Sequence, residues 1–106
     1  MIHVTASQIS GKKIVKTHGM VKGNTVRARH VGRDILAGFK NMVGGEITDY
    51  TKLLAESREQ SLDRMIEDAK TLGANAIVDV YFSTSMVSNL AAEILAYGTA
   101  VTVEDE

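Results

Sequence analysis

The sequence predicts an α+β domain in which one long helix packs on an antiparallel or mixed sheet, and three patterns support this prediction. Residues 48–72 carry one apolar stripe at helical spacing. Two segments before this helix and two after it alternate in the manner of strands. The chain has no proline, so Gly and Asn mark the turns. Because 106 residues contain no linker-like stretch, we expect a single domain over residues 1–106.

The first part of the chain is predicted to form a β-hairpin followed by a short helix. Residues 14–22 alternate loosely, and Gly23-Asn24 is a strong turn signal before a second strand over residues 25–31. Apolar residues then recur at helical spacing from residue 35 to residue 43, and the two following glycines can end that helix.

The second part of the chain supplies the long helix and two more strands. Thr48 or Asp49 can cap the helix, and Gly73 stands where a terminating glycine belongs. Residues 76–82 are rich in β-formers, with Val78, Val80 and Phe82 expected on one face, and residues 84–90 are expected to be a loop.

The last predicted strand, residues 92–103, has apolar groups on both faces. A single helix covers only one face of a sheet. The surplus apolar groups therefore need another partner, and a sister subunit is the simplest one. We accordingly expect a homo-oligomer.

The composition excludes several kinds of site. The chain has no cysteine, which rules out disulfides, thiolate zinc sites and a cysteine nucleophile. We see no signal peptide and no apolar stretch of about 18 residues, so we expect a cytoplasmic protein without a membrane partner. Nucleic acid is not an expected partner, because the net charge is −1 and aromatic residues make up 5%.

The net charge hides an asymmetry between the two parts of the chain. Residues 1–40 contain eight Lys or Arg and one acid, whereas residues 41–106 contain four basic residues and twelve acids. One interpretation is an anion-binding face. The other, which we favour, is that elements of opposite charge pack beside each other within or between subunits.

Four segments together resemble the signature of the YbjQ-like family. They are RARHVGRDILAGF (27–39), VGGE (43–46) with Tyr50 after it, LGANAIV (72–78) and GTAV (98–101). They occur in order, and the resemblance extends over residues 9–103. It implies a dodecin-like β/α fold assembled as a pentameric ring, or as two stacked rings in a decamer, in a bacterial or archaeal cytoplasm. The family is described as heavy-metal-binding, and the resemblance implies no catalytic residues.

One candidate site would bind an anion. Arg27, Arg29, His30 and Arg33 lie within seven residues beside a predicted helix start, where guanidinium groups and free amides suit phosphate or carboxylate. The alternative is that these side chains form salt bridges to the acidic long helix.

A second candidate site would bind a divalent metal. His18 and His30 lie on neighbouring predicted strands and can approach each other. The alternative is that both are ordinary hydrogen-bonded histidines, because no His-x-x-x-His or Glu-x-x-His pair occurs. Asp79, inside an apolar strand, is the one carboxylate whose pKa burial could raise.

Catalysis has the weakest support, because the chain has neither a P-loop nor a nucleophile elbow. We therefore expect a non-enzymatic homo-oligomer, most simply a pentamer, that binds a small ligand or partner at its subunit interfaces. Metal binding through histidine and carboxylate is one alternative. An enzyme or binder acting on an anionic substrate near Arg29 and Arg33 is another.

Overall fold

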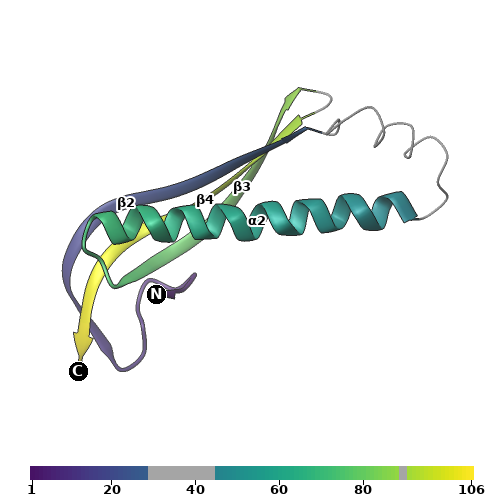
Figure 1. Cartoon of the computed structure of the whole chain (residues 1–106). Coiled ribbons are helices and arrows are strands. Elements are labelled where there is room, and N and C mark those ends of the chain that lie inside the picture. The colour runs from purple at the N-terminus through teal and green to yellow at the C-terminus, as the bar shows by residue number, and fades with distance from the viewer. Residues whose placement is uncertain (29–44, 89–90) are drawn as a thin grey trace.

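The computed structural model describes residues 1–28, 45–88 and 91–106 and shows one helix on a four-stranded mixed sheet (Figure 1). The strand order is β1-β3-β4-β2, with β1 parallel to β3 and the other neighbours antiparallel. The predicted fold class is therefore confirmed. The elements are β1 (Ile2–His3), β2 (Lys12–Ala28), α2 (Gly45–Thr71), β3 (Ala76–Ser88) and β4 (Ala91–Asp105).

The long helix α2 forms where the apolar stripe predicts it, but it begins at Gly45, so the predicted start at Thr48 or Asp49 is wrong. Its C-terminal end follows the sequence. Gly73 takes a left-handed φ of 79°, which costs a glycine little because it has no Cβ. Its N–H donates to the Lys70 carbonyl at 3.0 Å, and the Ala74 N–H donates to the Ala69 carbonyl at 3.2 Å. These two bonds form a Schellman motif that satisfies the last carbonyls of the helix. No described helix is long and apolar enough to span a membrane.

The predicted hairpin at Gly23-Asn24 is wrong, because β2 runs without a turn from Lys12 to Ala28. Helix α2 crosses the strand at this point. A Cβ added to Gly23 would lie 2.3 Å from the Ser61 carbonyl oxygen and 2.4 Å from the Met65 nitrogen. The glycine therefore allows a close approach of two backbones rather than a turn.

The predicted loop over residues 84–90 is also wrong within the part of the chain that is described. Strand β3 continues to Ser88 and stays paired with β4, with Thr84 opposite Ile94 and Met86 opposite Ala92. The serines and the threonine of this segment are polar, so the sequence did not indicate a strand. The strand forms because the segment pairs with β4, and a local sequence pattern does not report such a tertiary contact.

A bulge in β3 changes which side chains share a face. Asp79 has a φ of 54°, and the register with β4 shifts between Val78 and Tyr81. In consequence Val78 and Val80 belong to different hydrophobic clusters, on opposite faces of the sheet. The prediction that Val78, Val80 and Phe82 face together is therefore wrong, because an extra residue in a strand reverses the alternation after it.

The helix-facing cluster contains the buried core of the domain. Strand β4 contributes Ala96 and Ala100, and the small side chains let α2 lie close to the sheet. The cluster consists of Val21, Met65, Ala69, Ala74, Ile77, Val80, Ala96 and Ala100.

A second cluster lies on the other face of the sheet, at the end that contains both termini. The segment between β1 and β2 covers Val101 and Val103 with Val4 and Ile9. The chain itself thus covers part of the surplus apolar surface of β4. Burial of these two valines needs no sister subunit, contrary to the expectation. Leu95, further along the same face, remains half-exposed.

The described chain is unusually elongated. Its Cα radius of gyration is 17.3 Å and its extents are 57 × 21 × 17 Å, whereas a compact domain of this length has a radius near ~13 Å. Helix α2 packs chiefly on β2, less on β4 and hardly on β3. Within the described residues, much of β3 therefore has no helix packed on it.

Candidate functional site

The arginine-rich segment predicted to bind an anion falls largely outside the described residues. Arg27 lies on β2 opposite Ala92, and its side chain is not among those described. Arg29, His30 and Arg33 lie in the segment 29–44, outside the described ranges. The anion-binding hypothesis thus stays a prediction.

His18, the described member of the predicted metal pair, has a protein partner. It lies on β2 between two residues where the register with β4 shifts. Its Nε2 atom is 2.7 Å from the Thr102 hydroxyl oxygen in a half-buried position. This bond links β2 to β4 across the irregularity. His30 lies outside the described residues, and the hairpin that was expected to place its strand beside that of His18 does not form, because β2 continues from Lys12 to Ala28.

Metal-ligating side chains do not gather elsewhere in the described ranges. Residues 1–28, 45–88 and 91–106 contain no group of three or more His, Cys, Asp or Glu side chains able to hold an ion. His3 is exposed, and its Nδ1 is 2.9 Å from the Met1 carbonyl oxygen. The geometry of the described residues therefore gives metal binding no support of its own.

Asp79 is half-exposed rather than enclosed in an apolar strand. Its Oδ1 accepts a hydrogen bond of 2.8 Å from the Ser7 hydroxyl, and its N–H donates to the Ala6 carbonyl at 3.0 Å. Both contacts attach the N-terminal segment to the bulge of β3. The carboxylate thus has a structural partner that stabilises its left-handed backbone.

The predicted pairing of basic and acidic elements occurs at one described place. Lys12 on β2 forms a salt bridge with Asp105 at the end of β4. The hydrogen bond from Lys12, together with its positive charge, holds the pKa of Asp105 below its ordinary value. The carboxylate is exposed, so solvent screens most of this interaction.

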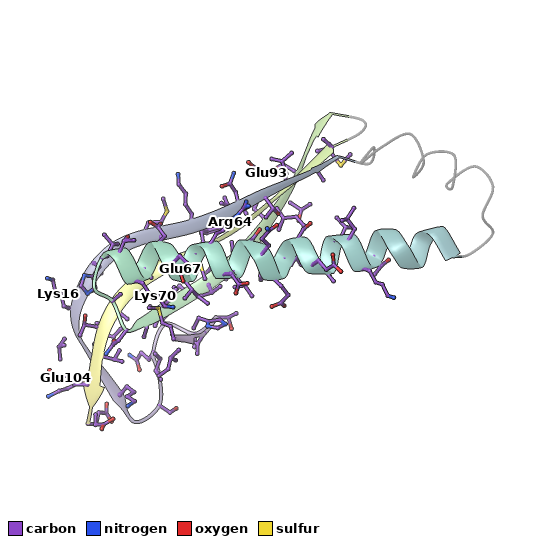
Figure 2. All side chains as sticks on the ribbon, in the orientation of Figure 1. Lys16, Arg64, Glu67, Lys70, Glu93 and Glu104 are labelled. Carbon is purple, nitrogen blue, oxygen red and sulfur yellow. The ribbon has the colours of Figure 1, made fainter. Side chains whose placement is uncertain are left out.

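Helix α2 meets the outer edge of β2 through side chains that bond to backbone. Asp68 Oδ2 accepts the Lys22 N–H at 3.1 Å. Arg64, which Figure 2 shows between α2 and β2, donates to the Asn24 carbonyl. These two charged side chains of the helix thus bond to backbone groups of β2.

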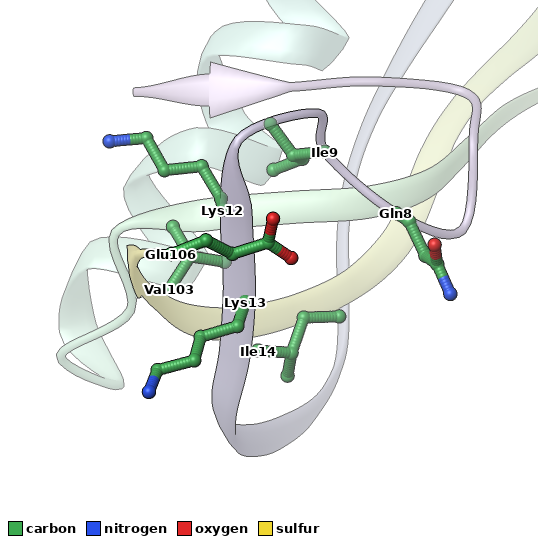
Figure 3. Close-up of a pocket in the computed structure, with 7 residues that line it drawn as sticks. All are labelled: Gln8, Ile9, Lys12, Lys13, Ile14, Val103 and Glu106. Carbon is green, nitrogen blue, oxygen red and sulfur yellow. The ribbon is translucent and has the colours of Figure 1, made fainter.

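A small pocket lies beside the end of β2, next to the C-terminal residues (Figure 3). Its volume is about 230 Å³, which is smaller than the usual pocket for a drug-sized ligand. Lys12, Lys13 and Glu106 are among the residues that line it, and Figure 3 shows the ammonium ends of both lysines extending away from the Glu106 carboxylate.

The most distinctive surface is the second half of β3. All six residues from Tyr81 to Met86 are exposed. Tyr81 is 50% exposed, Phe82 44% and Met86 57%. The Tyr81 ring lies 6.0 Å from that of Tyr97, its neighbour on β4. Exposed apolar and aromatic side chains of this kind make the segment a candidate interaction site.

Sequence reasoning missed this surface because it assigned most of the segment to a loop. One usable signal was present: Tyr81, Ser83 and Ser85 alternate with Phe82, Thr84 and Met86. Such a two-residue period is typical of a strand. The weak hydrophobicity of the serines concealed it.

Comparison with known proteins gives a consistent result across the chain. Residues 1–104 match a family model described as "Putative heavy-metal-binding". A UPF0145 protein of Methanosarcina acetivorans is 54% identical over 103 residues, which cover 97% of both chains. A UPF0145 protein of Clostridioides difficile is 52% identical over 106 residues, covering all of this chain and 95% of the relative.

A solved structure supports the fold. The crystal structure of a protein of unknown function from the DUF74 family of Pediococcus pentosaceus superposes with a TM-score of 0.67. The alignment covers 98% of each chain at 15% identity. This likeness extends to the arrangement of the helix and strands.

Proposed function

Because the chain belongs to the YbjQ-like family and the side chains from Tyr81 to Met86 of β3 are exposed, we propose that it is a non-enzymatic homo-oligomeric binding protein. We propose a dodecin-like pentameric ring, or two such rings in a decamer, in the cytoplasm. A small ligand or a partner binds at the subunit interfaces. The observation that carries the proposal is the exposure of the side chains in the second half of β3. The described sheet has a helix on one face only (Figure 1).

The exposed apolar side chains support assembly. On β2, Met20 is 70% exposed and Val26 54%, and on β3 Met86 is 57% exposed. Transfer of such side chains from water into an interface is favourable by roughly 25 cal/mol per Å² of apolar surface. A subunit 57 Å long and 17 Å thick buries this surface only against another molecule.

Native mass spectrometry of gently purified protein tests the proposal. We expect a species at five or ten times the subunit mass of 11.5 kDa, with an adduct whose mass identifies any retained ligand. A ring without adduct would support assembly and contradict retention of a small ligand. A monomer at micromolar concentration would overturn the proposal.

Metal binding is a second candidate function, which the family description favours. His18 is the described member of the predicted metal pair and could contribute at the expense of its contact with Thr102. Elemental analysis of native protein and of His18→Ala, both purified without a His-tag, would test it. A stoichiometric metal that His18→Ala loses would support this function, and no metal above background would dismiss it.

A further inference from the structure

The two outer edges of the sheet differ in how far other segments of the chain bond their backbone groups. Strand β2 lies at one edge, and its Lys22 N–H and Asn24 carbonyl are satisfied by Asp68 and Arg64 of α2. Charged side chains that cover an edge are a known protection against pairing with another strand. This edge is therefore closed where the helix passes it.

The first half of the β3 edge is also closed, by the N-terminal segment. The Val4 N–H donates to the Ile77 carbonyl, and the Val80 N–H donates to the Val4 carbonyl, both at 3.0 Å. The Asp79 N–H donates to the Ala6 carbonyl at 3.0 Å. Beyond Val80, the described residues form no further strand or backbone contact at this edge.

The direction of the remaining backbone groups follows from alternation along the strand. The Val80 N–H points outward, and the register with β4 is regular from Tyr81 to Met86. The N–H and C=O groups of Phe82, Thr84 and Met86 therefore point to the outside of the sheet.

The open segment lacks two of the devices that commonly prevent pairing, charged side chains and proline. Residues 80–88, VYFSTSMVS, contain no charged residue and no proline. Its side chains from Tyr81 to Met86 are exposed. An uncharged open edge with apolar neighbours is a template for addition of a strand.

We propose that residues 82–86 of β3 pair antiparallel with the same residues of a second copy of this chain, about a two-fold axis at Thr84. This pairing places Phe82 opposite Met86 of the second copy on the same face, so the two largest apolar side chains of the segment meet. No like charges oppose each other. The segment is thus complementary to itself, as a two-fold interface requires.

This inference rests on the proposed function and adds a second kind of contact to it. Neighbours within a five-membered ring meet through two different surfaces, whereas a two-fold contact uses the same surface twice. The β3 edge would accordingly join one ring to another, which makes the decamer the expected assembly. The sheets of two subunits then form one continuous sheet across the axis.

Disulfide cross-linking tests the two-fold contact, because the natural chain has no cysteine. In Thr84→Cys, the two new thiols face each other across the axis with Cα atoms about 5.5 Å apart, within the range for a disulfide. We expect a covalent dimer to form at least tenfold faster than in Ser10→Cys, whose exposed cysteine lies on the N-terminal segment. Equal, slow cross-linking of both variants would overturn the inference.

Amide hydrogen exchange on the natural protein gives a test that needs no variant. We expect slow exchange at Phe82, Thr84 and Met86 in the assembly and fast exchange after dissociation by dilution. The Lys22 amide, bonded to Asp68, is the internal control and should stay protected in both states. Fast exchange at the three β3 amides in the intact assembly would overturn the inference. A five-subunit species in which these three amides exchange fast would overturn the inference but leave the proposed function intact.

Discussion

The two ends of the sheet differ in how completely one chain buries them. At the end with both termini, α2 covers one face and Val4 and Ile9 cover the other, and Ile77 and Val101 are 0% and 1% exposed. At the other end, all six residues from Tyr81 to Met86 are exposed. The same strand therefore changes from core to surface, at the bulge of Asp79. We therefore expect folding of the subunit to depend on the first half of β3, and the proposed assembly to depend on the second half.

The largest expected effect concerns the crossing of α2 over β2. In Gly23→Ala, the new Cβ would overlap the Ser61 carbonyl oxygen and the Met65 nitrogen, both of them helix backbone. The helix must move away, so we expect a loss of about 3 kcal/mol or more in the free energy of unfolding. Urea unfolding of the variant measures it, with the exposed neighbour in Asn24→Ala as control. A loss below that of the control would contradict the close crossing.

A pair of methionines contrasts the two ends directly. Met65 is fully buried in the helix-facing cluster, and Met86 is 57% exposed. We expect Met65→Ala to lower the free energy of unfolding by about 2–5 kcal/mol, because it leaves a cavity. Met86→Ala should change it by less than about 0.5 kcal/mol in the dissociated subunit. Equal effects in denaturant titrations would show that the second half of β3 is buried in the single chain.

A smaller effect is expected at the buried polar contact between α2 and the sheet. The Ser61 hydroxyl is fully buried and donates to the Ile94 carbonyl at 3.1 Å, while its oxygen is 3.1 Å from the Thr25 hydroxyl. Ser61→Ala leaves that carbonyl without this donor, so we expect a loss of about 1–3 kcal/mol. Thermal unfolding measures it, and an unchanged or higher stability would show that the contact contributes nothing.

The smallest effect is the pH dependence of the Lys12–Asp105 salt bridge. The pKa of Asp105 is lower in the folded chain, because Lys12 bonds its charged form. The stability that this gives is therefore present above the unfolded pKa of about 4 and is lost as pH falls through the folded pKa. The difference in unfolding temperature between the natural chain and Asp105→Asn should be positive at neutral pH and disappear toward pH 2. A difference that grows on acidification would contradict this sign.

The metal and anion hypotheses illustrate the limit of sequence reasoning at the site. Spacing placed Arg27, Arg29, His30 and Arg33 in one segment, and three of them lie outside the described ranges. For His18 the sequence offered its place on a predicted strand next to the strand of His30. Its contact with Thr102 joins residues that are 84 positions apart in the sequence, and no local pattern predicts a contact between residues so widely separated.

The sequence by itself determined the helix and its C-terminal end, the two-sided strand β4 and the fold class. These follow from local periodicity, from the left-handed conformation open to Gly73, and from the alternation of side chains along a strand. Only the tertiary structure decided that Gly23 lies under a helix instead of in a turn, that β3 extends to Ser88, and which sheet edge stays open. Each of these depends on which distant segment lies alongside, because a glycine or a serine-rich strand is compatible with several local conformations and its neighbours select one.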